Sequence, residues 1–157
     1  MDLGLGDALH EPLPLTEGEY RQGPFAYALR PSPAEPGGWR FDHDPRGSFL
    51  GMDFRPEPVP MSAFTDRHRH LSTSPQSGFV RTATVQRRDA GGADVLRGLT
   101  LARVEETKTS TLLEKSHDYF AALADLFGLS LDDVTPAERA ALWGRLATAH
   151  ERWISAQ

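Results

Sequence analysis

Residues 25–54 read FAYALRPSPAEPGGWRFDHDPRGSFLGMDF, and this stretch determines the fold expected for the first part of the chain. Its apolar residues alternate with polar or small ones in three short sets: Phe25, Tyr27 and Leu29, then Trp39 and Phe41, then Leu50, Met52 and Phe54. An alternation of period two is typical of strands with one buried face. Proline and glycine interrupt it at residues 31–38 and 44–47, where turns are expected. The pattern predicts a small antiparallel sheet or barrel.

Further along the chain, the sequence predicts a short helix and then a hairpin. The helix is expected over residues 61–71. Two longer strand candidates follow at residues 79–88 and 95–104. Asp89-Ala90-Gly91-Gly92 between them has the composition of a hairpin turn.

After residue 111 the apolar period becomes that of helices. We expect Ser116 to cap a first helix that Gly128 ends, because glycine adopts the left-handed conformation found after helices. Thr135-Pro136-Ala137-Glu138 predicts the start of a second helix, which should run to about Ser155. The residues expected on the buried faces are Tyr119, Phe120, Leu123, Leu126 and Phe127 in the first helix, and Leu142, Leu146, Ala149 and Trp153 in the second, with Ala141 and Ile154 beside them. The fold class is therefore α/β in the broad sense (α+β), a β-rich lobe followed by a lobe with a hairpin and two helices.

Composition excludes several classes of protein. The 157 residues are 39% hydrophobic and 25% charged, as in ordinary globular proteins. Seventeen basic against 22 acidic residues give a net charge of −5, which disfavours binding to nucleic acid or anionic lipid. There is no cysteine, so disulfides, thiolate metal sites and thiol nucleophiles are excluded for these residues. With no membrane-length apolar run and no signal-peptide pattern, we expect no membrane association and a cytoplasmic location.

The residues taken singly do not define a reaction. Asp66, His68 and His70 lack the spacing of metal ligands on a helix, so no metal site is predicted. The hydroxyl-rich residues 72–77 are expected to form a loop or a helix exit. The remaining carboxylates and histidines have no spacing that selects an acid and a base, and surface roles are expected for the histidines. They are Asp2, Asp42, Asp44, Glu105 and Glu106, with His10, His43, His117 and His150.

The order of several segments along the chain is more informative. Asp2-Leu3-Gly4-Leu5-Gly6-Asp7 and Glu11-Pro12-Leu13-Pro14-Leu15 are followed by Ser72-Thr73-Ser74-Pro75-Gln76-Ser77-Gly78-Phe79, Val85-Gln86-Arg87-Arg88, Leu96-Arg97-Gly98-Leu99-Thr100-Leu101 and Phe127-Gly128-Leu129-Ser130-Leu131. This order resembles the arylamine N-acetyltransferase family. The resemblance covers nearly the whole chain, which corresponds to the C-terminal three-fifths of a usual member.

The resemblance implies a fold and an activity. Family members have a helical domain with a catalytic cysteine, then a β-barrel domain and an α/β lid, which here would be residues 1–70 and 71–157. They transfer acetyl from acetyl-CoA, a cosubstrate, to an arylamine, arylhydroxylamine or hydrazine through a cysteine thioester. A Cys-His-Asp triad generates the thiolate.

The resemblance also implies site residues. Asp2 is at the position of the triad aspartate, and Leu5 replaces the usual phenylalanine of the acceptor pocket. Phe79 would line the same pocket, whereas Thr82 and Thr84 would contact acetyl-CoA. Ser74 stands where the family commonly has histidine.

The family's cysteine and histidine precede Asp2, so we expect these 157 residues alone to be inactive. One hypothesis is that Met1 marks a misplaced start or a gene broken upstream. A separately encoded N-terminal half, or self-association through the uncovered face, is the expected partnership otherwise. Two alternative functions remain open: a non-catalytic binding or partner module, and a relative of the ansamycin amide synthases, which Leu5 would permit.

Overall fold

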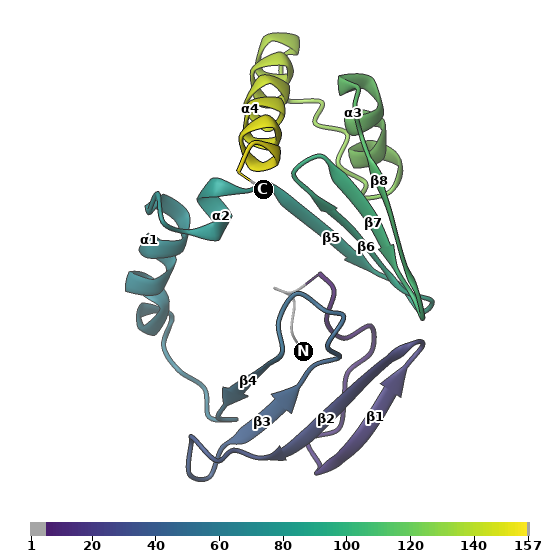
Figure 1. Ribbon diagram of the computed structural model, residues 1–157. Helices are drawn as coiled ribbons and strands as arrows, with labels where there is room; N and C mark the ends of the chain where they lie inside the picture. Colours follow the sequence, from purple (N-terminus) through teal and green to yellow (C-terminus); the bar gives the residue numbers. More distant parts are fainter. Residues whose placement is uncertain (1–5, 157) are drawn as a thin grey trace.

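The computed structural model describes residues 6–156, which form two four-stranded antiparallel sheets joined and flanked by helices (Figure 1). The first sheet contains β1 (Gly18–Gln22), β2 (Phe25–Pro31), β3 (Trp39–Asp42) and β4 (Gly51–Phe54) in the order β1-β2-β3-β4. The alternating sets of the sequence therefore correspond to β2, β3 and β4. The sheet is open, so the expectation of a closed barrel is wrong for the described residues. Its apolar residues pack instead against Leu9 and Leu13, which precede β1, and against residues of the second sheet.

The second sheet contains β5 (Thr84–Arg88), β6 (Ala93–Arg97), β7 (Thr100–Val104) and β8 (Lys108–Leu112), again in sequential order. The single strand predicted over residues 95–104 is wrong. It is two strands, because Gly98 turns the chain with a left-handed φ of 56°. The predicted hairpin is thus part of a four-stranded meander.

The helical segments lie between and after the sheets. The 3₁₀-helix η1 (Met61–Phe64) and α1 (Thr65–Thr73) confirm the short helix predicted here. They continue to α2 (Gly78–Arg81), and the three form an arc that joins the sheets (Figure 1). The helices α3 (Ser116–Asp125) and α4 (Pro136–Ile154) lie at the far end of the second sheet, as Figure 1 shows.

The ends of the two C-terminal helices follow the sequence in most respects. Thr135 and Glu138 form the predicted capping box at the start of α4. Gly128 follows α3 with the expected left-handed φ of 70°. Ser116 is the first residue of α3 and not its cap, since the cap position is Lys115 and no side chain caps it.

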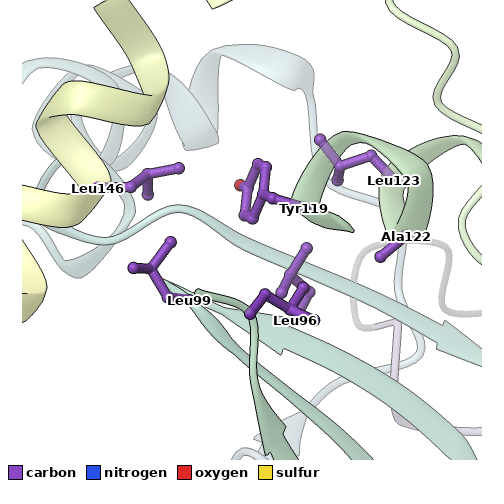
Figure 2. Packing of buried hydrophobic residues seen from close by; sticks show 7 residues of the cluster. Leu96, Leu99, Tyr119, Ala122, Leu123 and Leu146 are labelled. Carbon is purple, nitrogen blue, oxygen red and sulfur yellow. The ribbon is translucent and has the colours of Figure 1, made fainter. Parts of the chain in front are cut away.

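The described residues form two apolar cores. The second sheet packs against α3 and α4 through seven buried residues, drawn as sticks in Figure 2: Leu96, Leu99, Leu113, Tyr119, Ala122, Leu123 and Leu146. The core of the first sheet contains Phe25, Tyr27, Leu29 and Phe41, together with Ala93 and Val104 from β6 and β7. The two sheets therefore share a core where they meet.

Part of the predicted buried face of α3 and α4 is exposed. Leu126, directly after α3, is exposed, and so are Ala149, Trp153 and Ile154 on the last two turns of α4. The core contacts of α4 come from Leu142, Trp143 and Leu146, in its first three turns. The amphipathic pattern of the α4 sequence therefore extends beyond the part of the helix that packs against the core.

Candidate functional site

Gly6 places the start of the described chain against the second sheet. A Cβ atom on Gly6 would lie 2.5 Å from the carbonyl oxygen of Gln86 in β5. That distance is shorter than any normal contact, so a residue with a side chain does not fit without a shift of the backbone. The expected site residues Asp2 and Leu5 lie outside the described residues. Gly6, which directly follows Leu5, lies against Gln86 of β5, two residues after Thr84.

Polar contacts hold the next residues on the first sheet. The buried carboxylate of Asp7 accepts hydrogen bonds from the Ser48 backbone N–H at 2.6 Å and the Ser48 hydroxyl at 2.9 Å. The Tyr27 hydroxyl donates to the Ala8 carbonyl at 2.8 Å. Burial raises the pKa of Tyr27, which keeps this hydroxyl protonated as a donor. Asp7 and Ala8 are thus tied to the loop between β3 and β4 and to β2, respectively.

His43 belongs to the same cluster and was wrongly expected at the surface. Its side chain is buried, with Nδ1 2.8 Å from the Asp44 carbonyl oxygen and Nε2 3.2 Å from the Asp7 carbonyl oxygen. The ring also lies 4.5 Å from the Phe49 ring. Because Asp7 is 36 residues away in sequence, local spacing gives no signal for this contact.

Asp44 is a buried structural carboxylate. It accepts hydrogen bonds from the side chain and backbone N–H of Arg46 and from the backbone N–H of Ala26. These contacts, chiefly the one with the Arg46 guanidinium, hold the pKa of Asp44 well below its ordinary value. The Asp-Pro-Arg-Gly sequence at residues 44–47 could have indicated this structural role for Asp44. An aspartate at the start of a turn commonly accepts a hydrogen bond from the backbone N–H two residues later.

The other expected site residues lie around α2. Phe79 was expected on a strand, but it is on this short helix, and its side chain is 77% exposed. Thr82 follows the helix, and its N–H donates to the Gly78 carbonyl. Thr84 is the first residue of β5 and is exposed. The helix begins here because the buried Ser77 accepts from the Phe79 N–H and donates to the Leu71 carbonyl.

The chemistry available in this part of the molecule is limited. Asp66, His68 and His70 are exposed on α1. Among residues 6–156, no group of three or more histidine, aspartate or glutamate side chains is placed to hold a metal ion. Nor does any helix in that range have the length and apolar character needed to cross a membrane.

Comparison with known proteins defines the class. A family model described as N-acetyltransferase matches residues 1–135. The fold resembles solved arylamine N-acetyltransferases. That of Mycobacterium smegmatis is 25% identical, with a TM-score of 0.71 over 91% of this chain and 51% of that chain. That of Mycobacterium marinum, solved in complex with CoA, is 23% identical, with a TM-score of 0.72 over 88% and 50%. That of Mycobacterium abscessus is 23% identical, with a TM-score of 0.68 over 83% and 48%.

The chain belongs to the arylamine N-acetyltransferase family. It spans about half the length of the solved structures that it matches. No curated protein sequence matches it. Because these 157 residues contain no cysteine, they cannot form a cysteine thioester by themselves.

Proposed function

We propose that this chain is the part of an arylamine N-acetyltransferase that follows the catalytic cysteine and histidine. The complete cytoplasmic enzyme would transfer acetyl from acetyl-CoA to an arylamine, arylhydroxylamine or hydrazine. The observation that carries this proposal is the family match over residues 1–135. Asp2, within that range, is proposed as the triad aspartate. The division into residues 1–70 and 71–157, as second domain and lid, is part of the same proposal.

The proposed reaction has two transfers. The cysteine thiolate would attack the thioester carbon of acetyl-CoA; the C–S bond to CoA breaks, CoA takes a proton from the protonated histidine and leaves as a thiol, and acetyl is left as a new thioester on the enzyme. The acceptor nitrogen then attacks that thioester, loses a proton to the histidine and releases the cysteine. Asp2 would accept a hydrogen bond from the histidine and hold it in the required tautomer.

Residues in this chain would contribute the binding surfaces. Phe79 would line the acceptor pocket with Leu5, and Thr82 and Thr84 would contact acetyl-CoA. The exposure of Phe79 and Thr84 supports this proposal because both side chains are accessible. The contact of Gly6 with Gln86 supports it further, since it brings the segment that follows Leu5 to the strand containing Thr84.

A partner is part of the proposal. Large apolar side chains are exposed along the arc from β4 to α2, namely Leu50, Val59, Met61, Phe64, Phe79 and Val80. Neither η1 nor α1 contains a buried residue, and helices this short are not stable in water on their own. We propose that the polypeptide with the cysteine and histidine, on the same chain or separately encoded, covers this surface. Self-association would be the alternative.

The intact mass of the endogenous protein is the first test. If the mass exceeds 17.3 kDa, that longer product should acetylate an arylamine with acetyl-CoA. Its Asp2→Asn variant should be roughly a thousandfold slower or worse. Asp125→Asn, on the exposed side of α3, is the matched control and should retain activity. At 17.3 kDa the protein alone should show no turnover, and acetyl transfer by it that survives Asp2→Asn would contradict the proposal.

Leu5 permits a second candidate, an amide synthase of the ansamycin type. Loss of an aromatic side chain at this position removes a flat face on which a small arylamine could stack. In a competition assay with the longer product, this candidate requires an acyl thioester of a long chain to be preferred over acetyl-CoA. A preference for acetyl-CoA would exclude it.

A further inference from the structure

Both ring nitrogens of His43 face backbone carbonyl oxygens. Nδ1 lies 2.8 Å from the Asp44 oxygen, and Nε2 lies 3.2 Å from the Asp7 oxygen. A carbonyl oxygen can only accept a hydrogen bond, and a neutral imidazole has one N–H to donate. The neutral ring can therefore satisfy one of these carbonyls, and only the doubly protonated ring can satisfy both. Because the contact with Asp44 is the shorter, the contact with Asp7 is the one that the neutral ring leaves unmade.

The ring is fixed in this position by its neighbours. It lies directly on the backbone of Gly47, where an added Cβ atom would overlap the ring atoms of His43. The rings of Phe49, Tyr27 and Phe41 surround it, with centres 4.5, 5.3 and 5.9 Å away. The side chain is 6% exposed. A change of rotamer would displace these neighbours, so both nitrogens stay opposite the two carbonyls.

Asp7 is the residue through which this contact acts. Asp2, proposed as the triad aspartate, precedes it by five positions. Ser48 holds the carboxylate of Asp7, whereas His43 holds its backbone carbonyl. The contact with His43 therefore fixes the direction of the main chain at the residue where the segment containing Asp2 joins the first sheet.

The charged groups around the ring balance one another. The Asp44 carboxylate is paired with the Arg46 guanidinium at 2.8 Å, and Asp7 is a second buried carboxylate. The Arg88 guanidinium lies close enough to the Tyr27 hydroxyl to act on it, as do both carboxylates. Two carboxylates and two guanidinium groups give no net charge, so no excess of either sign fixes the ring in one protonation state where histidines titrate. Protonation adds one charge-assisted hydrogen bond, the one to Asp7.

We propose that His43 is a positioning residue for the transferase site and that its hold on the Asp7 carbonyl depends on pH. When the ring is doubly protonated, it donates to both carbonyls and fixes the chain that follows Asp2. When the ring is neutral, it keeps its contact with Asp44 and releases Asp7. The consequence for catalysis rests on the proposed function, whereas the contact itself does not.

The backbone N–H of Ser48 reports the contact in the endogenous protein. It donates to the Asp7 carboxylate at 2.6 Å, so it is protected from solvent exchange while Asp7 is in place. Between about pH 5.5 and about pH 8.5, its protection factor should fall about tenfold, because a hydrogen bond from a charged donor is lost. The ¹⁵N shifts of the His43 ring record the protonation directly, and the exposed His68 and His70 serve as internal references.

Two variants complete the exchange test. His43→Gln retains an N–H donor but does not titrate, so the protection factor of Ser48 should be the same at both ends of the pH range. His117→Gln, exposed on α3, is the matched control and should keep the profile of the parent. Equal pH dependence in the parent and in His43→Gln would overturn the proposal. A His43 ring that stays in one protonation state over the whole range would also overturn it.

Activity tests the positioning role if the endogenous protein is longer. His43→Gln should lower kcat for acetyl transfer several-fold at about pH 6 and much less at about pH 8.5, with KM unchanged. A ratio of parent to variant kcat that is the same at both pH values would overturn the positioning role. If the parent also transfers no acetyl, the proposed function fails instead. Exchange at Ser48 requires no turnover, so it decides the His43 contact in either case.

Discussion

The guanidinium carbon of Arg88 lies 4.4 Å from the centre of the Phe25 ring, where the two sheets meet. Arg88 is at the end of β5, and Phe25 is the first residue of β2. The guanidinium of Arg46 lies over the same ring at 5.0 Å. Phe25 is 1% exposed, so the ring to which both guanidinium groups bind is shielded from water. Two arginines and one aromatic ring thus connect the sheets.

Arg88→Met should lower the free energy of unfolding by about 2 to 4 kcal/mol. The variant loses the cation–π contact and the hydrogen bonds, both 2.7 Å long, to the carbonyls of Gln22 and Gly92. Urea unfolding measures the loss. Arg97→Met, at an exposed position of β6, is the control and should change stability little. An effect of Arg88→Met no larger than that of the control would show that Arg88 does not connect the sheets.

Gly6→Ala should loosen the segment of residues 6–9, because the added Cβ would lie 2.5 Å from the Gln86 carbonyl oxygen. We expect faster amide exchange at Ala8 and Leu9 and a stability loss of about 1 to 3 kcal/mol. Gly78→Ala is a matched control, since a Cβ there meets nothing within 4 Å. Hydrogen-exchange mass spectrometry compares the protection of residues 6–9 in the two variants. Unchanged protection of the segment in Gly6→Ala would mean that close packing on β5 does not hold it.

The strands that could be predicted are those with a buried face. Alternation was visible in β2, β3 and β4 because their inward side chains form the core. It was absent in β8, whose five residues are all exposed at the edge of its sheet. β1, also an edge strand, has only half-buried and exposed positions. β8 is therefore formed by backbone pairing alone, whereas in β1 the half-buried Tyr20 also packs against the core of the first sheet.

The polar cluster around Asp7 could not be predicted for a different reason. Its partners Ser48 and His43 are 41 and 36 residues away, so only the folded sheet brings them together. The motif containing Asp2 and Leu5 could be interpreted from sequence through resemblance alone. Composition excluded a thiol nucleophile from these residues without any structure.

Asp44→Asn should destabilise the protein by about 2 to 4 kcal/mol near neutral pH, because Arg46 loses its buried anionic partner. The pKa of Asp44 in the folded state lies below its ordinary value of 3.8, so its ionisation stabilises the fold above that value. This stabilisation is lost as the pH falls below 3.8 toward the lowered pKa. Urea unfolding between pH 7 and pH 3 should therefore show a constant difference between the variant and the parent down to about pH 4, and a difference that begins to narrow below it. Asp125→Asn, exposed on α3, should show no such narrowing. A constant difference across the range would contradict the assignment.

Thr135→Ala should lower the free energy of unfolding by about 1 kcal/mol, because it removes the side-chain cap at the start of α4. The Thr135 hydroxyl accepts from the Glu138 N–H at 3.3 Å, and the Glu138 carboxylate accepts from the Thr135 N–H at 2.9 Å. The Thr135 hydroxyl also donates to that carboxylate, and these bonds lower the pKa of Glu138. A double-mutant cycle with Glu138→Gln measures the coupling. Additive effects would show that the two residues act independently and that the capping box contributes nothing beyond its parts.

Gly144→Ala and Gly128→Ala should change stability in opposite directions. A Cβ at either position meets nothing within 4 Å, so packing is the same for both and only the backbone differs. Gly144 lies inside α4, where alanine should add about 0.5 to 1 kcal/mol by restricting the unfolded chain. Gly128 has a φ of 70°, which alanine adopts at a cost of about 1 kcal/mol. Thermal unfolding of both variants and the parent measures the two changes. A gain at Gly128 would mean that this residue does not hold the left-handed conformation after α3, and that the chain between α3 and α4 follows a different path.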